Sequence, residues 1–144
     1  MIYIDTSCLV KLLCEEPESD AVREAVEVEE QIIISSLTEL EAEVELKGME
    51  LGGELRVGQW RQYQAKLAAM KNLDPFVFRF LPASVFQTAL RQHRHARSVY
   101  CRSLDRLHLA AMEEMNVSRL MTLDRKQAEV ATALGFKVLQ PGRK

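Results

Sequence analysis

Short apolar segments of strand length alternate along this chain with longer segments of helical periodicity, and this alternation restricts the fold more than any other feature. The strand-like segments lie at residues 2–5, 31–34, 76–80, 119–122 and 136–139. Helical patterns occupy residues 6–14, from Pro17 to about 30, from the second strand to about 49, and 54–73, 82–97, 103–115 and 124–134. Strands that alternate with helices form βαβ units. We therefore predict an α/β domain with a parallel sheet of about four to five strands and helices on both faces.

Length and composition are those of one ordinary globular domain, which we expect to span residues 1–144. The sequence is 47% hydrophobic with few Gly and Pro residues, so it is able to bury a substantial core. No apolar run approaches the roughly 20 residues of a membrane span, and the amino end does not resemble a signal peptide. The three cysteines lack metal-type spacing, and their odd number fits reduced thiols in a cytoplasmic protein.

The net charge of −2 hides a strong asymmetry along the chain. Residues 1–54 hold 15 of the 21 acidic residues but only three of the 19 basic ones. Basic residues are dense between residues 91 and 106, where the candidates for contact with nucleic acid are Arg91, Arg94, Arg97 and Arg102. Charge alone leaves two interpretations open, a basic face that meets a polyanion or a pair of solvated helix surfaces.

Four acidic residues stand at the edges of predicted strands and helices. Asp5 ends the first strand, Asp124 lies just past the fourth, and Glu41 and Asp105 lie near the starts of helices. The carboxyl ends of parallel strands share one edge of the sheet, where ligands bind at the point at which the strand order reverses. Carboxylates that converge there need a positive partner, and an oxygen-only cluster suits Mg²⁺ or Mn²⁺.

Two of these acids also have a purely structural interpretation. Asp5 is a suitable N-cap for the helix that begins at residue 6, because Asp is a preferred residue at that position. Asp124 and Gln127 have the spacing of a capping box at the start of the last helix. Asp105 is harder to explain as a cap, because it borders an apolar helix face and precedes His108 by three residues. Cap and cluster therefore both remain open for the first two acids.

The acidic helix after the second strand requires a choice among several glutamates. Ser36 and Glu39 have the spacing of a capping box, which would engage Glu39 locally. Glu41 lies one turn further on, beside a packed apolar face, whereas Glu43 and Glu45 fall where a solvated face is expected. We therefore select Glu41 as the member of the acidic cluster.

The chain resembles the PIN-domain nucleases, and most closely the VapC-type toxin subunit of VapBC toxin–antitoxin pairs. Four stretches carry the resemblance in the family's order, namely YIDTS at residues 3–7, SSLTELE at 35–41, LDRLHLA at 104–110 and MTLD at 121–124. The closing ALGFKVL at 133–139 fits as well, so the match spans nearly the whole chain. The resemblance implies a PIN-like three-layer α/β/α domain. It also implies a metal-dependent endoribonuclease that hydrolyses RNA phosphodiester bonds.

Carried over to matching positions, the resemblance implies that Mg²⁺ or Mn²⁺ is held by Asp5, Glu41, Asp105 and Asp124. Polar family positions beside the cluster, which support the acids or contact phosphate, correspond to Thr6, Ser7 and Thr122. His108 also matches a family position, and its apolar surroundings favour a structural histidine over a general base. One departure concerns the helix after Glu41, where further glutamates follow in place of the arginines that many relatives carry.

Partners and rival functions follow from the same resemblance. It implies an RNA substrate, a VapB-type antitoxin, a homodimer and no membrane association. A helical stripe of Trp60, Tyr63, Leu67 and Met70 is either core packing or part of a groove for the antitoxin. Two other functions remain open, an RNA-processing nuclease outside a toxin pair and an inactive PIN-fold binding module. The basic residues from 91 to 106 would steer RNA toward the acids, whereas the RNA target itself is not specified.

Overall fold

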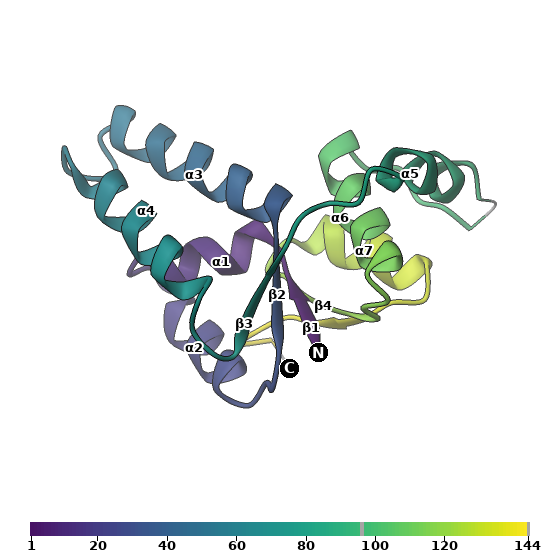
Figure 1. The fold of residues 1–144 in the computed structure, drawn as a ribbon, viewed down its shortest axis with the longest axis horizontal. Coiled ribbons are helices and arrows are strands. Elements are labelled where there is room, and N and C mark those ends of the chain that lie inside the picture. Colours follow the sequence, from purple (N-terminus) through teal and green to yellow (C-terminus); the bar gives the residue numbers. More distant parts are fainter. Residues whose placement is uncertain (96, 144) are drawn as a thin grey trace.

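One five-stranded parallel sheet organises the protein, as the alternation of segments predicts (Figure 1). The computed structural model describes residues 1–95 and 97–143. The strands are β1 (Ile2–Ile4), β2 (Ile32–Ser35), β3 (Phe76–Arg79), β4 (Arg119–Met121) and β5 (Lys137–Leu139). Their order across the sheet is β3-β2-β1-β4-β5, and every neighbouring pair is parallel. The chain therefore adds β2 and β3 on one side of β1, and then β4 and β5 on the other side.

The central strands are buried on both faces, which explains their uniformly apolar sequences. Every residue of β1 and β2 is buried, and the register pairs Ile2 with Ile32 and Tyr3 with Leu120. The edge strands β3 and β5 are only partly buried. Because side chains alternate across a strand, Ile2 and Ile4 face one helical layer and Tyr3 faces the other.

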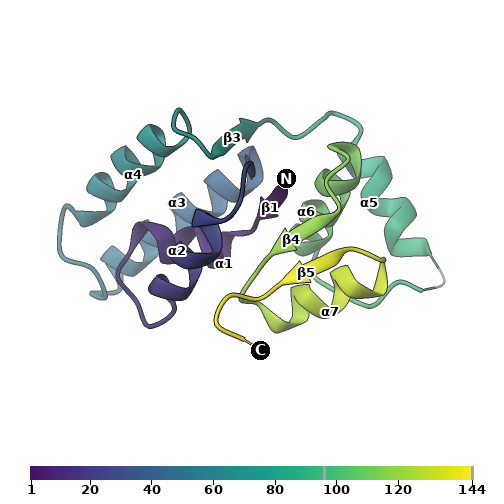
Figure 2. The same cartoon turned by 90° about the horizontal axis from the view of Figure 1, so that it is seen from below.

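Four helices cover the first face of the sheet (Figures 1 and 2). They are α1 (Thr6–Leu13), α2 (Ser19–Glu27), α3 (Ser36–Leu51) and α4 (Gln59–Met70). In the aromatic stripe of α4, Leu67 and Met70 are buried, and Trp60 and Tyr63 pack partly buried against the same core. Core packing therefore accounts for Leu67 and Met70, whereas a groove for an antitoxin beside the half-buried Trp60 and Tyr63 stays a prediction.

Three helices cover the opposite face, α5 (Val85–Arg94), α6 (Ser103–Glu114) and α7 (Arg125–Ala133) (Figures 1 and 2). Their apolar residues form a second core with Tyr3 and Ile33 of the sheet, in which Leu109 and Met112 of α6 are fully buried. Two cores on either side of one sheet make the three-layer α/β/α arrangement of the prediction.

Three helices are clearly shorter than their sequence patterns indicate. The pattern from Pro17 to about 30 yields α2, which begins at Ser19 and ends at Glu27. The pattern at 54–73 yields a helix that begins only at Gln59, because the chain turns through Gly53 and Gly58, both at positive φ. The pattern at 82–97 yields α5, which starts after a turn closed by the Val85 amide on the Pro82 carbonyl and ends before the extended His95. Residue 96 lies outside the described residues.

The strand order reverses between β1 and β4, which lie side by side although β2 and β3 intervene in the sequence. The amide of Asp5 donates to the carbonyl of Met121 at 3.1 Å, so the two strands end together. Polar residues that follow these strands are thereby placed at the edge where α/β sheets bind ligands. Within the described residues no helix is long and apolar enough to cross a membrane, and the three cysteines are free.

Candidate functional site

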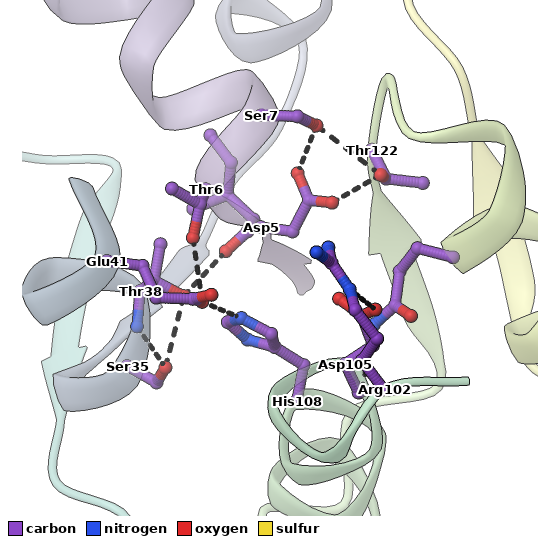
Figure 3. Close-up of polar contacts among 12 residues, drawn as sticks. Asp5, Thr6, Ser7, Ser35, Thr38, Glu41, Arg102, Asp105, His108 and Thr122 are labelled. Carbon is purple, nitrogen blue, oxygen red and sulfur yellow. Dashed lines mark hydrogen bonds and ion pairs between the residues drawn. The ribbon is translucent and has the colours of Figure 1, made fainter. Parts of the chain in front are cut away.

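All four predicted acids line one cleft at the carboxyl edge of the sheet, between the starts of α1, α3, α6 and α7. Figure 3 shows three of them, Asp5, Glu41 and Asp105. The cleft has a volume of about 430 Å³. Its polar walls are formed by Asp5, Thr6, Ser7, Glu41, Glu45, Arg102, Asp105, His108, Asp124 and Gln127. Leu37, Leu40, Val44 and Leu104 supply apolar walls. Residues from four separate parts of the sequence thus meet in one place.

Asp5 is the most deeply placed acid of the cleft, with 5% of its surface exposed. Its Oδ1 accepts hydrogen bonds from the Ser7 hydroxyl at 2.6 Å and from the Cys8 amide at 3.2 Å, and its Oδ2 accepts from Thr122. The bond from Cys8 caps α1, so the cap interpretation is correct and does not exclude a place in the cluster. Burial raises the pKa of Asp5 above its ordinary value, and the two hydroxyl donors oppose that rise only in part.

Glu41 is held by two side chains from opposite sides of the cleft. Thr6 Oγ1 donates to Glu41 Oε1 at 3.0 Å, and His108 Nε2 hydrogen-bonds the same oxygen (Figure 3). Burial acts to raise the pKa of Glu41, but the bonds from His108 and Thr6 outweigh it and leave the pKa below its ordinary value. Glu41 is therefore a carboxylate at neutral pH.

His108 belongs to a buried chain of hydrogen bonds that runs under the cleft. A carboxylate only accepts, so the proton that His108 shares with Glu41 lies on Nε2. Nδ1 is hydrogen-bonded to the Tyr3 hydroxyl, which is 2.7 Å away and also lies 2.6 Å from the Ser35 hydroxyl. Both ring nitrogens are engaged and the side chain is 3% exposed, which supports a structural role for His108 over that of a general base.

Asp105 lies on the first turn of α6 and is the acid with a direct cationic partner. Arg102 Nε lies 3.3 Å from Asp105 Oδ2, and Arg102 itself is exposed at the mouth of the cleft. The side chain of Gln127 donates to the backbone carbonyl of Asp105 at 3.0 Å. That bond ties the start of α7 to the start of α6.

Asp124 caps α7 with one oxygen, because its Oδ1 accepts from the amides of Lys126 at 2.8 Å and Gln127 at 3.1 Å. The predicted reciprocal bond from the Gln127 side chain is not made, since that side chain contacts Asp105 instead. The capping box is therefore only half formed.

The predicted capping box at the start of α3 is wrong. The N-cap is Ser35, whose hydroxyl accepts from the Thr38 amide at 3.1 Å, whereas Ser36 accepts from the Leu81 amide. Glu39 turns away from the cap and pairs with Lys71 of the chain segment after α4. Local spacing did not identify the cap, because a distant lysine is a better partner for a partly buried carboxylate.

Glu45 is exposed, as the sequence pattern predicts, but it also borders the cleft, which the pattern did not indicate. It lies one turn after Glu41 on α3 and lines the same cleft. Burial and the nearby Glu16 raise the pKa of Glu45 above its ordinary value. The spacing of four residues from Glu41 was the available signal, because it puts both side chains on one helix face.

The donor chemistry of the cleft fits a hard divalent cation. Five acids line it, opposed by the single guanidinium of Arg102, and their donor atoms are all oxygen. A carboxylate oxygen that accepts one or two hydrogen bonds still has capacity for a cation, since the group has about four acceptor sites. The fit is one of donor chemistry and not of position, because within the described residues no group of three or more His, Cys, Asp or Glu side chains is arranged to hold a metal ion.

The predicted RNA-binding arginines do not form one surface at this cleft. Arg102 lines the cleft, whereas Arg91 and Arg97 line a separate hollow beside the carboxyl end of α7. Arg91 also pairs with Glu113 of α6. Arg94 is exposed at the last turn of α5. Only Arg102 therefore lies where a substrate in the cleft would meet it directly.

Comparison with known proteins identifies relatives along nearly the whole chain. Residues 2–133 match the family model described as PIN domain. Ribonuclease VapC35 of Mycobacterium tuberculosis is 32% identical over 149 residues, covering 99% of this chain and 98% of that protein.

Solved structures share the fold at lower identity. M. tuberculosis VapC20, described as a Sarcin-Ricin loop cleaving toxin, gives a TM-score of 0.70 at 17% identity, over 98% of this chain and 100% of that one. VapBC2 from Rickettsia felis, bound to a DNA fragment from its promoter, gives a TM-score of 0.68 at 18% identity. The match covers 96% of this chain and 98% of that one.

Proposed function

Because the chain belongs to the PIN-domain family, we propose that it is an endoribonuclease that hydrolyses RNA phosphodiester bonds. The observation that carries the proposal is the meeting of Asp5, Glu41, Asp105 and Asp124 in one cleft at the switch point of the sheet. The nearly full-length similarity to a protein named as a ribonuclease supports it. We take residues 1–144 as a single PIN domain.

The cofactor of this proposal is Mg²⁺ or Mn²⁺, held by the carboxylates of Asp5, Glu41, Asp105 and Asp124. When bound, such an ion activates water and neutralises the negative charge that develops on the phosphate oxygens during hydrolysis. Burial raises the pKa of Asp5, so a cation bound beside it would favour the charged form of this carboxyl.

The other polar residues of the cleft orient the acids. Ser7 and Thr122 fix both oxygens of Asp5, and Thr6 fixes one oxygen of Glu41. Their hydroxyls are thus committed to carboxylates, which favours support of the acids over contact with phosphate. Arg102 stands at the rim beside Asp105, where its charge would bind a phosphate of the incoming RNA.

We further propose that the nuclease is the toxin of a VapBC-type pair, acting in the cytoplasm as a homodimer and restrained by an antitoxin. The acidic composition of residues 1–54 supports this, since these residues would attract a basic segment of a partner. An RNA-processing nuclease outside a toxin pair has the same cleft and is the second candidate. An inactive binding module is disfavoured by the presence of all four acids.

The decisive experiment is cleavage of a labelled pool of structured RNA by the purified protein with Mg²⁺, Mn²⁺ or EDTA. We expect cleavage with either metal, none with EDTA, and a loss of more than about 100-fold in rate for Asp105→Asn, which keeps the shape but removes a ligand charge. Asp20→Asn, at an exposed acid on α2, is the matched control and should cleave normally. Cleavage by Asp105→Asn at the normal rate would exclude this site.

Expression in cells separates the toxin from the processing enzyme. A toxin should arrest growth on induction, the Asp105→Asn variant should not, and co-expression of a small protein encoded next to it should restore growth. Growth unaffected by an active nuclease would favour the RNA-processing function.

A further inference from the structure

A second hollow lies between α5 and α6, on the other side of the α6 amino terminus from the acidic cleft. Its volume is about 490 Å³, within the range of about 300–1,000 Å³ of small-molecule sites. We call it the α5–α6 hollow, and its principal walls are Phe86, Leu90, Tyr100, Ser103, Arg106 and Leu107. Figure 1 shows the two helices packed together at the edge of the molecule.

Arg106 is a buried cation in the wall of this hollow, with 5% of its surface exposed. Its Nη2 donates to the Ser98 hydroxyl at 2.8 Å and to the Val99 carbonyl at 2.9 Å. Its Nε and Nη1 are buried and find no acceptor among the described residues, and no carboxylate there forms an ion pair with it. A buried guanidinium with unmet donors is costly, so this site calls for an anion or a strong acceptor.

The thiol of Cys101 does not supply that anion. It borders the same hollow, and burial raises the pKa of Cys101 above its ordinary value, which the charge of Arg106 opposes only in part. The thiol is therefore neutral at neutral pH and is a weak acceptor. Among residues 1–95 and 97–143, no anionic side chain pairs with Arg106.

The amino terminus of α6 points to the same chemistry. The N-cap residue is Arg102, which makes no side-chain cap hydrogen bond, and Ser103 of the first turn lines the hollow. The first amides of a helix carry a partial positive charge and bind phosphate readily. Two independent features, an uncapped helix start and an unpaired buried guanidinium, thus favour a phosphate.

The hollow and the acidic cleft lie on either side of the first turns of α6 and share one lining residue, Arg102. Helical spacing places Leu104, Asp105 and His108 toward the cleft, and Ser103, Arg106 and Leu107 toward the hollow. Arg102 lines both. A strand whose phosphate lies at Asp105 would therefore pass Arg102 and enter the hollow with its next nucleotide.

We propose that the α5–α6 hollow binds one nucleotide of the RNA next to the scissile bond, an inference that rests on the proposed ribonuclease function. Its phosphate lies at the α6 amino terminus and Arg106, and its base stacks on Phe86 and Tyr100, whose side chains are 63% and 75% exposed. Exposed aromatic rings beside cationic groups are the usual elements of single-stranded RNA sites. A protein partner would bury the rings but would leave no reason for the unpaired guanidinium between them.

The first test measures binding, with EDTA present to prevent cleavage. The probe is a single-stranded RNA of about six nucleotides with one 2-aminopurine, whose fluorescence falls when its base stacks. We expect Phe86→Ala and Tyr100→Ala to weaken binding about five- to hundredfold and to reduce the fluorescence change, whereas Tyr100→Phe keeps both. Phe80→Ala is the matched control, because Phe80 is 79% exposed and lies outside the hollow.

The second test uses Arg106→Met, which preserves length and removes the charge. We expect weaker RNA binding, and the slope of log affinity against log salt concentration should fall by about one, the value for one phosphate contact. The melting temperature should stay the same or rise, because an unpaired buried charge is gone. Arg23→Met, at a half-buried arginine of α2 that lines neither the hollow nor the cleft, is the control and should leave binding unchanged. A merely structural arginine predicts the opposite result, lower stability with normal binding. If Arg106→Met does not fold, the binding measurements on Phe86→Ala and Tyr100→Ala test the proposed nucleotide site.

Three outcomes overturn the inference. These are unchanged binding in all the hollow variants, no binding of the probe by the wild-type protein, and variants that alter the oligomeric state in light scattering without altering RNA binding. Cleavage assays on the same proteins keep the two proposals apart. Wild-type cleavage with unaffected variants would reject the nucleotide site alone, whereas probe binding that depends on the hollow without any cleavage would reject the ribonuclease function alone.

Discussion

His108 and Glu41 are hydrogen-bonded to each other although 67 residues separate them in the sequence. Glu41 belongs to the helical layer on one face of the sheet and His108 to the layer on the other, so their bond joins the two layers across the carboxyl edge (Figure 3). Tyr3 of the central strand supports the histidine from below. The position of one acid of the cleft is thereby fixed by the sheet and both layers.

His108→Gln should weaken Mn²⁺ binding by about 10- to 100-fold in calorimetric titration. The reason is that a residue which orients a metal-binding carboxylate contributes to affinity without touching the ion. His93→Gln, at an exposed histidine on α5, is the matched control and should bind as the wild type does. Equal affinity in both variants would show that Glu41 needs no support from the histidine.

Tyr3→Phe should lower the free energy of unfolding by about 1–3 kcal/mol, because the buried hydrogen bonds to Ser35 and His108 lose their common partner. Burial raises the pKa of Tyr3, so the hydroxyl is protonated and available as a donor at all ordinary pH values. Urea denaturation measures the loss. Tyr100→Phe removes an exposed hydroxyl and should change stability by less than about 0.5 kcal/mol. An equal loss of unfolding free energy in both variants would contradict a stabilising role of the buried hydrogen bonds of Tyr3.

Cys14 should make the protein less stable at alkaline pH. Burial raises the pKa of Cys14 to about 11 in the folded protein, against about 8.5 for an unfolded thiol. The folded state therefore holds this proton more tightly, and its contribution, complete below about pH 8.5, is lost as pH rises toward 11, by at most about 1.4 kcal/mol per pH unit. Denaturation curves across this range should fall more steeply for the wild type than for Cys14→Ala. Parallel curves would exclude the thiol as the cause.

Reversing the charge of Arg94 and Arg97 should slow RNA cleavage several-fold at low salt and have little effect at high salt. The structure places both residues away from the cleft, so their contribution would be long-range attraction, which salt screens. Arg102→Glu should have the larger effect at every salt concentration, because Arg102 lines the cleft. Cleavage by the double variant that equals the wild type at all salt concentrations would refute electrostatic steering by this segment.

Much of the fold followed from local sequence patterns. Apolar segments of strand length predicted all five strands to within about two residues. A strand that is covered on both faces, such as β2, needs consecutive apolar residues, and such a run is easily found in the sequence. The start of α4 was misplaced, because residues 54–58 have helical composition while Gly58 takes a positive φ that ends any helix pattern before it. The cap of α3 was misplaced by one residue, because Ser35 and Ser36 are equivalent in sequence and only their distant partners distinguish them.

The sequence by itself determined the order of strands and helices and the acids that stand at their ends, because periodicity and capping chemistry act over a few residues. Only the tertiary structure decided which side chains face one another. It placed Glu45 at the cleft with Glu41, paired Glu39 with Lys71, and buried Arg106 with two donor atoms that have no partner among the described residues. These outcomes depend on contacts between distant segments, whose strength is set by burial and by the partners that the packed fold supplies.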